Sequence, residues 1–357
     1  MMRTLKIYTT ILVCAWMITS CEKTKNDDTV SFHLSKGFFI VNEGAFGQSN
    51  GEVSFISDDG SQKITKLFKM INSRALGDVI QSMKIIDDKG YIVANNSQKI
   101  EVVSMDNFKS IGVITGLSSP RYMLKVSNGK AYVSDWIANN IKIIDLNSNT
   151  ITGTIATGNG PEQLLLLNDK VYVTNVGGFG NDSTLTVINT LTNTVVTTVQ
   201  TGVNPNSLSL DANGRLWILC GGTLGPDYLA NTADDIGGKL IKMDTATNMV
   251  LNTFYFGQGE HPLKITSIQN KTKLYFLRGS SAYTGTVCVM DLNATSLPAT
   301  PLINREFYGL GVNPENENIV GGIGSFSTDS WVLRYNSSGV LSDSLKVGIG
   351  PNGFAFN

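Results

Sequence analysis

Short apolar segments alternate with short polar ones along almost the whole chain. The apolar segments are rich in β-branched and aromatic residues, and Gly, Asn, Asp or Pro stands between them. This pattern predicts strands joined by tight turns. Turn sequences separate such segments at Asn128-Gly129, at residues 211–214 and at residues 58–60. No stretch has a sustained helical period, so the pattern predicts an all-β protein.

The segments recur in a fixed order of four pieces. The first piece is apolar and often begins with proline; its seven copies start at Ser82, Pro120, Pro161, Pro205, Pro262, Glu306 and Pro351. A turn, a second apolar piece, a third that ends in an acid or amide, and a Thr-rich fourth piece follow. Positions 120, 161 and 205 are 41 and 44 residues apart. Four short strands in a repeat of about 40–45 residues are typical of a propeller blade.

The two ends of the repeat region complement each other. Residues 351–356 form a first piece with no second piece behind it, and residues 37–42 form a second piece with no first piece before it. We therefore expect residues 36–357 to form a seven-bladed β-propeller of four-stranded antiparallel blades. The C-terminal strand pairs with the N-terminal strands in this scheme, which closes the ring and removes an exposed edge. An open solenoid is the alternative. It explains neither why the repeat stops at seven copies nor why each end of the repeat region carries an unmatched piece.

The first residues predict export. A basic start with Arg3 and Lys6 precedes an apolar run over residues 11–18. This run is shorter than the roughly 20 residues of a membrane-spanning helix, so residues 1–20 are predicted to be a signal peptide. Residues 18–21 resemble a bacterial lipobox, which would place a lipid on Cys21. A plain signal peptide cut elsewhere is the alternative. Residues 21–35 are polar and are expected to form a flexible tether after the lipidated cysteine.

Charge and residue types exclude several kinds of chemistry. The net charge is −1 and no Lys/Arg run occurs, which argues against a nucleic-acid partner. With two histidines and no metal-ligand spacing after the signal peptide, we predict no metal site, no catalytic residues and no cofactor. Acidic residues between Asp227 and Asp235 are interpreted as solvated turns rather than a calcium loop. Cys220 and Cys288 lie in apolar strands and are expected to be buried free thiols rather than a disulfide.

One face of a propeller carries the loops between second and third pieces and those between blades. The candidate ligand-binding residues on these loops are mostly aromatic or Arg: Phe46, Arg74, Arg121, Tyr122, Trp136, Phe179, Tyr228, His261, Arg278, Tyr283, Tyr308 and Phe326. Aromatic side chains offer large contact area and stack on planar ligands. The alternative is that about half of them pack between blades. The segment 221–238 is longer than a hairpin needs, which is typical of a functional loop.

The second piece, best seen at Tyr172-Val173-Thr174-Asn175, resembles the YVTN-type propeller repeat. Residues 41–47, 76–83, 119–122, 161–164 and 175–180 together resemble a Bacteroides-type group of surface propeller lipoproteins. One branch of that group binds cobalamin and passes it to a TonB-dependent outer-membrane transporter. The resemblance implies a lipid-anchored protein on the cell surface, attached to the outer membrane by its lipid alone, that captures a ligand such as a corrinoid. A protein-interaction propeller that supports a transporter or surface layer is the alternative, and a propeller lactonase or lyase is a third.

Overall fold

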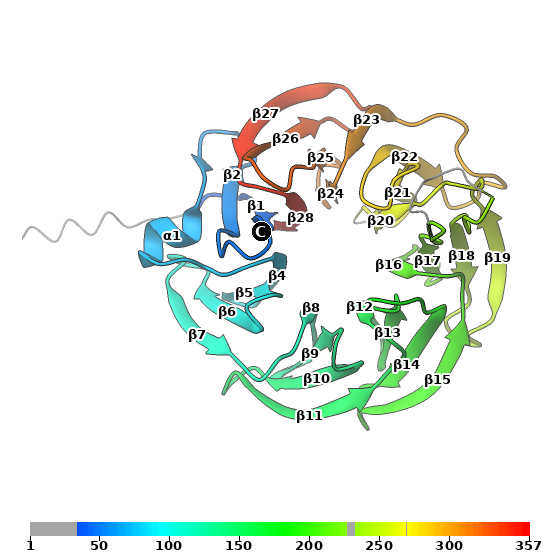
Figure 1. Cartoon of the computed structure of the whole chain (residues 1–357), viewed down its shortest axis with the longest axis horizontal. Helices are drawn as coiled ribbons and strands as arrows, with labels where there is room; N and C mark the ends of the chain where they lie inside the picture. Colours follow the sequence, from blue (N-terminus) through cyan, green and yellow to red (C-terminus); the bar gives the residue numbers. More distant parts are fainter. Residues whose placement is uncertain (1–33, 227–232, 269) are drawn as a thin grey trace, which may run out of the picture. The chain divides into compact units, whose positions relative to one another are not determined.

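The computed structural model describes residues 34–226, 233–268 and 270–357. Its strands form seven four-stranded antiparallel sheets that follow one another around a central axis (Figure 1). The predicted seven-bladed β-propeller is therefore confirmed. The predicted signal peptide, Cys21, most of the tether and Tyr228 lie outside the described residues. No helix among the described residues is long and apolar enough to cross a membrane.

Each blade consists of four strands, ordered from the axis outward. Blade 1 contains β28 (Pro351–Phe356), β1 (Gly37–Asn42), β2 (Glu52–Ser57) and β3 (Lys63–Ile64). Blade 2 contains β4 (Ile80–Ile86), β5 (Lys89–Ala94), β6 (Lys99–Ser104) and β7 (Ser110–Ile114). Blade 3 contains β8 (Pro120–Ser127), β9 (Lys130–Asp135), β10 (Asn140–Asp145) and β11 (Thr150–Ala156).

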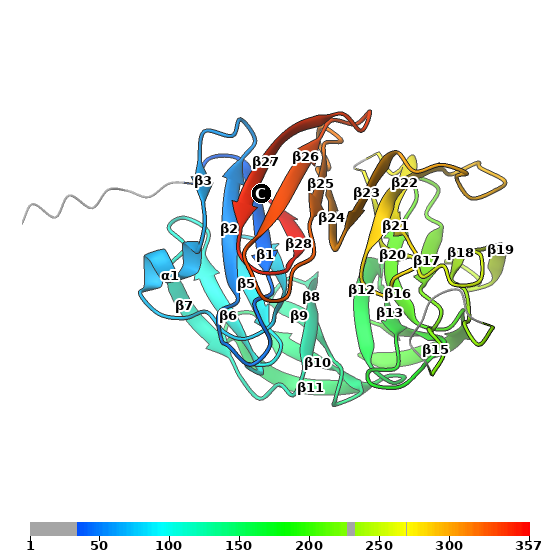
Figure 2. The ribbon, with the colours of Figure 1, turned by 45° about the horizontal axis from the view of Figure 1, so that its top comes forward.

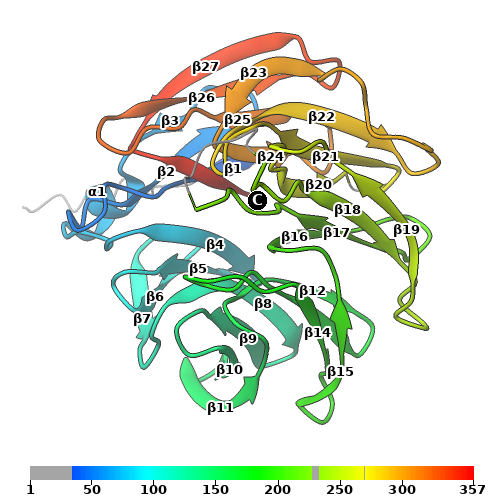
Figure 3. The same cartoon turned by 45° about the vertical axis from the view of Figure 1, so that its right-hand side comes forward.

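The other four blades repeat this order. Blade 4 contains β12 (Pro161–Leu167), β13 (Lys170–Asn175), β14 (Thr184–Asn189) and β15 (Thr194–Gln200). Blade 5 contains β16 (Pro205–Leu210), β17 (Leu216–Cys220), β18 (Lys239–Met243) and β19 (Val250–Tyr255). Blade 6 contains β20 (Leu263–Ser267), β21 (Lys273–Arg278), β22 (Gly285–Asp291) and β23 (Ile303–Phe307), and blade 7 contains β24 (Gly309–Val312), β25 (Ile319–Gly322), β26 (Ser330–Tyr335) and β27 (Leu341–Val347). The tilted views show the same order, with β11, β15, β19 and β27 on the circumference (Figures 2 and 3).

The C-terminal strand closes the ring, as the two ends of the sequence predicted. Strand β28 pairs antiparallel with β1, and Phe38 lies opposite Phe356. The Phe38 ring lies 6.1 Å from the Phe354 ring and 5.5 Å from the Phe356 ring. Closure therefore adds an aromatic cluster to the backbone pairing, and β1 has a partner on each side.

The repeated tyrosine of the second piece explains how the blades hold together. Tyr91, Tyr132, Tyr172 and Tyr275 are all buried, each in the second strand of its blade. The hydroxyl of Tyr132 donates to Asn193 Oδ1 in the next blade, and that of Tyr172 donates to the Thr245 carbonyl in the blade after its own. Burial raises the pKa of Tyr132 to about 12. In these two blades the tyrosine ring thus fills the space between blades while its hydroxyl has a hydrogen-bond partner.

Other details of the sequence analysis are confirmed or corrected. Gly60, Gly129 and Gly214 have φ near +73°, which the three predicted turns require. Cys220 and Cys288 are buried free thiols, as expected. The first strand of blade 7 is Gly309–Val312 rather than 306–310, because residues 303–307 pair as the outer strand of blade 6.

A short helix that the apolar pattern did not predict is also present. This helix, α1 (Leu67–Asn72), follows β3, and Leu67 and Phe68 are its buried residues. The Glu52 carboxylate accepts hydrogen bonds from the backbone N–H groups of Phe68 and Lys69 at 3.2 and 3.0 Å. Six residues are too few for a helical period to appear in the sequence, so only the tertiary contacts identify this helix.

Candidate functional site at the mouth of the axial channel

Six of the seven inner strands have a β-bulge, and these bulges lie at the same end of the propeller. Register shifts occur next to Ile80, Pro120, Pro161, Pro205 and Pro351, and in β20 between Leu263 and Thr266. A bulge bends its strand and redirects a side chain. The residues in these bulges are Gln81, Arg121, Tyr122, Glu162, Gln163, Asn206, Lys264, Ile265 and Asn352. All of them except Ile265 line one cavity on the axis.

This cavity, which we call the mouth cavity, has a volume of about 390 Å³. Every blade contributes to it, because Tyr308 just before β24 completes the circle formed by the bulges. Loop residues that include Glu43, Trp136 and Tyr283 also line it. A pocket of this size with aromatic walls and a few converging polar groups is typical of a small-molecule site.

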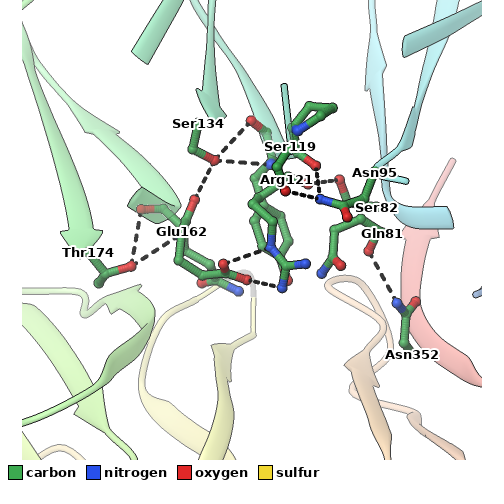
Figure 4. A network of polar contacts seen from close by, with 12 residues as sticks. Gln81, Ser82, Asn95, Ser119, Arg121, Ser134, Glu162, Thr174 and Asn352 are labelled. Carbon is green, nitrogen blue, oxygen red and sulfur yellow. Dashed lines mark hydrogen bonds and ion pairs between the residues drawn. The ribbon is translucent and has the colours of Figure 1, made fainter. Parts of the chain in front are cut away.

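A buried ion pair forms one side of the mouth cavity. Arg121 donates from Nε and Nη2 to the two oxygens of Glu162, at 2.9 and 3.0 Å (Figure 4). The guanidinium also lies 4.0 Å from the centre of the Trp136 ring. Burial disfavours the guanidinium charge, but the nearby Glu162 carboxylate outweighs it, so the pKa of Arg121 is raised. A paired guanidinium held against an indole gives the cavity a rigid, planar wall.

A second polar pair lies across the junction of blades 7 and 1. The Tyr308 hydroxyl donates to Glu43 Oε2. Burial raises the pKa of the Glu43 carboxyl, and the hydrogen bond from Tyr308 only partly offsets this effect. Burial, followed by the charge of Glu43, also raises the pKa of Tyr308. The Glu43 carboxyl in the wall of the mouth cavity therefore holds its proton more tightly than a free carboxyl does, and the Tyr308 hydroxyl stays protonated.

Amide side chains line the rest of the mouth cavity. Asn352 donates from Nδ2 to the backbone carbonyls of Ile80 and Gln81 at 3.3 Å, which ties blade 1 to blade 2. Its Oδ1 is buried without a hydrogen-bond partner among the described residues. The Gln81 side chain points toward Arg121 and Glu162 (Figure 4). These groups leave hydrogen-bonding capacity available to a ligand.

An aromatic rim surrounds the mouth. Phe46, Phe179 and Phe326 lie in three different loops between second and third strands, and Phe179 is 93% exposed. Together with Trp136 they line a neighbouring cavity of about 600 Å³, which also includes Glu43. Tyr283 and Phe326 contact each other edge to face, with ring centres 6.3 Å apart. Exposed aromatic side chains gathered on one face are typical of binding surfaces.

The structure gathers eight of the twelve predicted site residues around the mouth. Arg121, Tyr122, Trp136, Tyr283 and Tyr308 line the mouth cavity, and the aromatic rim holds Phe46, Phe179 and Phe326. Tyr228 lies outside the described residues.

The remaining three, Arg74, His261 and Arg278, line neither the mouth cavity nor the neighbouring cavity at the rim. Arg74 pairs with Glu101 and covers the Phe68 ring at 4.8 Å. Arg278 forms a bidentate pair with Glu260 at 2.7 and 3.0 Å. His261 is buried, with Nδ1 2.9 Å from the Gly221 carbonyl oxygen. Loop position alone predicts that these three residues lie on the face that carries the mouth. In the structure, their local partners hold the side chains away from both cavities.

Sequence reasoning missed the polar residues of the bulges. Gln81, Glu162, Asn206 and Asn352 line the mouth cavity, but the strand pattern does not single them out as site residues. A usable signal is present, because the residue after the repeated proline is polar in four copies, Arg121, Glu162, Asn206 and Asn352. A strand pattern of period two does not reveal it, since a bulge shifts the alternation.

Comparison with known proteins supports the fold. A family model described as Domain of unknown function (DUF5074) matches residues 36–347. No curated protein matches the chain.

Solved structures give the same picture at low identity. A quinonprotein alcohol dehydrogenase-like protein from Bacteroides thetaiotaomicron is similar with a TM-score of 0.65 at 14% identity, covering 90% of this chain and 78% of that one. A putative 6-phosphogluconolactonase from Bacteroides fragilis has a TM-score of 0.64 at 11% identity, covering 90% and 98%. Hydrazine synthase from Kuenenia stuttgartiensis has a TM-score of 0.62 at 13% identity, covering 74% and 85%. These similarities concern the fold.

Proposed function

The chain belongs to the family of domains of unknown function DUF5074, and on that premise we propose that it is a binding protein that captures a bulky, partly planar ligand at the propeller mouth. The ligand we propose is a corrinoid. The protein would hold it at the outer face of the outer membrane, through a lipid on Cys21, and pass it to a TonB-dependent transporter.

The observation that carries this proposal is the combination of a polar cavity and an aromatic rim on one axis. The mouth cavity and the neighbouring cavity share Glu43 and Trp136, so a ligand wider than either can lie across both. The exposed rings of Phe46 and Phe179 are available for stacking on a planar group. The amides of Gln81 and Asn352 match the carboxamide groups that surround a corrin ring, because a carboxamide both donates and accepts hydrogen bonds.

The rigidity of the scaffold favours capture. A closed ring holds its loops with little freedom, so a ligand is bound with a small loss of side-chain entropy. The bidentate pair between Arg121 and Glu162 adds to this, because both side chains are fixed before a ligand arrives. The choice of a corrinoid rests on the resemblance of residues 76–83, 120–122 and 161–164 to the surface lipoprotein group.

A protein-interaction propeller is the second candidate, and the aromatic rim favours it. Phe46 is 79% exposed and Phe179 is 93% exposed, which suits contact with a protein surface as well as with a small molecule. A lactonase or lyase is supported by the names of distant structural neighbours, the putative 6-phosphogluconolactonases from Bacteroides fragilis and Bacteroides uniformis, at 11% and 12% identity.

Calorimetry and absorbance titration of the purified protein with a panel of corrinoids test the proposal. We expect Trp136→Ala to weaken binding by about 1 kcal/mol or more, the size typical of an interface anchor. Tyr255→Ala is the matched control, since Tyr255 is an exposed aromatic that lines neither the mouth cavity nor the cavity at the rim. Absence of any heat or spectral change with every corrinoid at micromolar protein would reject the ligand and leave the protein-interaction candidate.

A further inference from the structure

The axial channel continues inward from the mouth into a second space. This space, which we call the inner channel, has a volume of about 380 Å³. It shares Gln81, Tyr122, Gln163, Lys264 and Asn352 with the mouth cavity, so the two are continuous. The residues that line it among those described include two lysines, Lys84 and Lys264, and no Asp or Glu. Lys84 therefore adds a positive charge that the mouth cavity does not contain, and Lys264 is shared by both spaces. The charge of Lys264 also acts on the Glu43 carboxyl in the mouth cavity.

Lys84 breaks the pattern of the repeat. It lies opposite Tyr91 in the pairing of β4 with β5. The residues opposite the equivalent tyrosines of blades 3, 4 and 6 are Leu124, Leu165 and Thr266. A cation therefore occupies a position that other blades fill with an uncharged side chain. Lys84 lies four residues along β4 from Ile80, the residue next to the bulge. At roughly 3.3 Å per residue, this places Lys84 about 13 Å along the strand from the bulge end.

The ammonium of Lys84 has no partner of its own within the described part of the chain. No hydrogen bond or ion pair joins it to another described residue. Its side chain is exposed to solvent within the channel, and the surrounding walls still desolvate it enough to lower its pKa. A partly desolvated cation without a counter-charge is unfavourable, and an anion placed beside it reduces that penalty.

Lys264 provides an independent observation. Its φ angle is +58°, in the left-handed region that a residue other than glycine rarely adopts. This conformation belongs to the bulge of β20 and directs Lys264 into the channel, where Nζ donates to the Asn352 carbonyl at 3.1 Å. Lys264 retains two further N–H donors for a ligand.

We propose that the inner channel is a binding site for an oxyanion, such as a phosphate or carboxylate, held between the ammonium groups of Lys84 and Lys264. Gln81 and Gln163, which line both spaces, are the neutral groups placed to add hydrogen bonds to it. The oxyanion has two sources: a free ion, or an anionic arm of a larger ligand seated at the mouth. The second source rests on the proposed function and the first does not.

The experiment measures binding of inorganic phosphate and of two corrinoids to the purified full-length protein by calorimetry. The corrinoids are cobalamin, which carries a phosphodiester in its nucleotide arm, and cobinamide, which lacks that arm. The variants are Lys84→Met and Lys264→Met. Lys346→Met is the matched control, because Lys346 is an exposed lysine on the outer strand β27. Thermal unfolding confirms that each variant is folded, and Lys84→Gln is the second variant at this position.

A free-ion site predicts that phosphate binds the wild type and that each channel variant weakens it about tenfold, the size of a lost charge-assisted hydrogen bond. An anionic-arm site predicts that cobalamin binding weakens to the same degree while cobinamide binding is unchanged. The control variant Lys346→Met binds phosphate and both corrinoids as the wild type does. The proposal is overturned if phosphate binding and the difference between the two corrinoids are both insensitive to Lys84→Met and Lys264→Met. Failure of every corrinoid to bind rejects the corrinoid part of the proposed function. The phosphate titration then still decides whether the inner channel binds an oxyanion.

Discussion

At the scale of single residues, the mouth is stabilised by polar groups that satisfy one another. Arg121 and Glu162 are largely buried and come from neighbouring blades, so their pairing joins blade 3 to blade 4 as well as shaping the cavity. Because burial removes water from both groups, each charge is stabilised mainly by its partner. Removing one partner should therefore cost more than removing both.

Replacement of Arg121 by Met should destabilise the fold by about 3 kcal/mol, because Glu162 is left as an unpaired buried carboxylate. Denaturant unfolding measures this change. The double variant Arg121→Met/Glu162→Met should be more stable than the single variant. Arg215→Met is the matched control, since Arg215 and Asp244 form a more exposed pair, for which about 1 kcal/mol or less is expected. Equal losses for Arg121→Met and Arg215→Met would contradict the prediction.

Glu43 makes stability depend on pH. Burial raises the pKa of Glu43 in the folded state above its ordinary value of 4.5, so the folded protein holds this proton more tightly than the unfolded chain does. The resulting stability is fully present below the unfolded pKa and is lost as pH rises through the folded pKa. The variant Glu43→Gln lacks this loss and keeps an acceptor for Tyr308.

We therefore expect Glu43→Gln to match the wild type in melting temperature near pH 4 and to exceed it at pH 8. Thermal unfolding at several pH values measures the difference. A difference in melting temperature between variant and wild type that stays the same from pH 4 to pH 8 would contradict the raised pKa of Glu43.

At the scale of elements, close backbone contact between blades 7 and 1 limits the side chains that fit. A Cβ atom added at Gly322 in β25 would lie 2.1 Å from the Pro351 carbonyl oxygen in β28. Backbone cannot move aside as the end of a long side chain can, so the strand that closes the ring would be displaced.

The substitution Gly322→Ala should destabilise the protein by about 2 kcal/mol through this overlap. Gly353→Ala is the matched control, because Gly353 lies in β28 itself and a Cβ atom there meets nothing within 4 Å. Thermal unfolding of both variants gives the comparison. The interpretation fails if the two substitutions have equal effects.

At the scale of the whole molecule, stability depends on closing the ring. Deletion of residues 351–357 removes β28, which leaves an edge of β1 unpaired and exposes Phe38 and the inner face of blade 1. We expect the truncated protein to lose most of its stability and to be cleaved rapidly in limited proteolysis. A truncated protein that melts like the wild type would mean that the blades hold together without closure.

The proposed anchor is tested at the same scale. Cys21→Ser should move the protein from the membrane fraction to the soluble fraction, because several acyl chains at about 0.8 kcal/mol per buried CH₂ give a durable anchor. Incorporation of labelled fatty acid into wild type and variant measures the modification directly. Label that remains on the variant would place the lipid elsewhere.

The repeat explains why the fold was predictable and the site only in part. The strand pieces, the glycines of the turns and the unmatched ends at residues 37–42 and 351–356 specified seven closed blades without any tertiary information. The loops gave the aromatic residues of the mouth, such as Trp136 and Tyr283. They also gave Arg74 and Arg278, whose carboxylate partners Glu101 and Glu260 lie far enough along the chain to be invisible in a local pattern.

The sequence by itself determined the number of blades, their order and the closure of the ring, because period-two patterns and turn residues are local signals that recur in every blade. Only the tertiary structure decided where individual side chains point. Bulges reverse the alternation of the inner strands, so Gln81, Glu162 and Asn352 face the axis. The charge of the inner channel likewise depends on Lys84 and Lys264, which lie in different blades and meet one space only because the ring is closed.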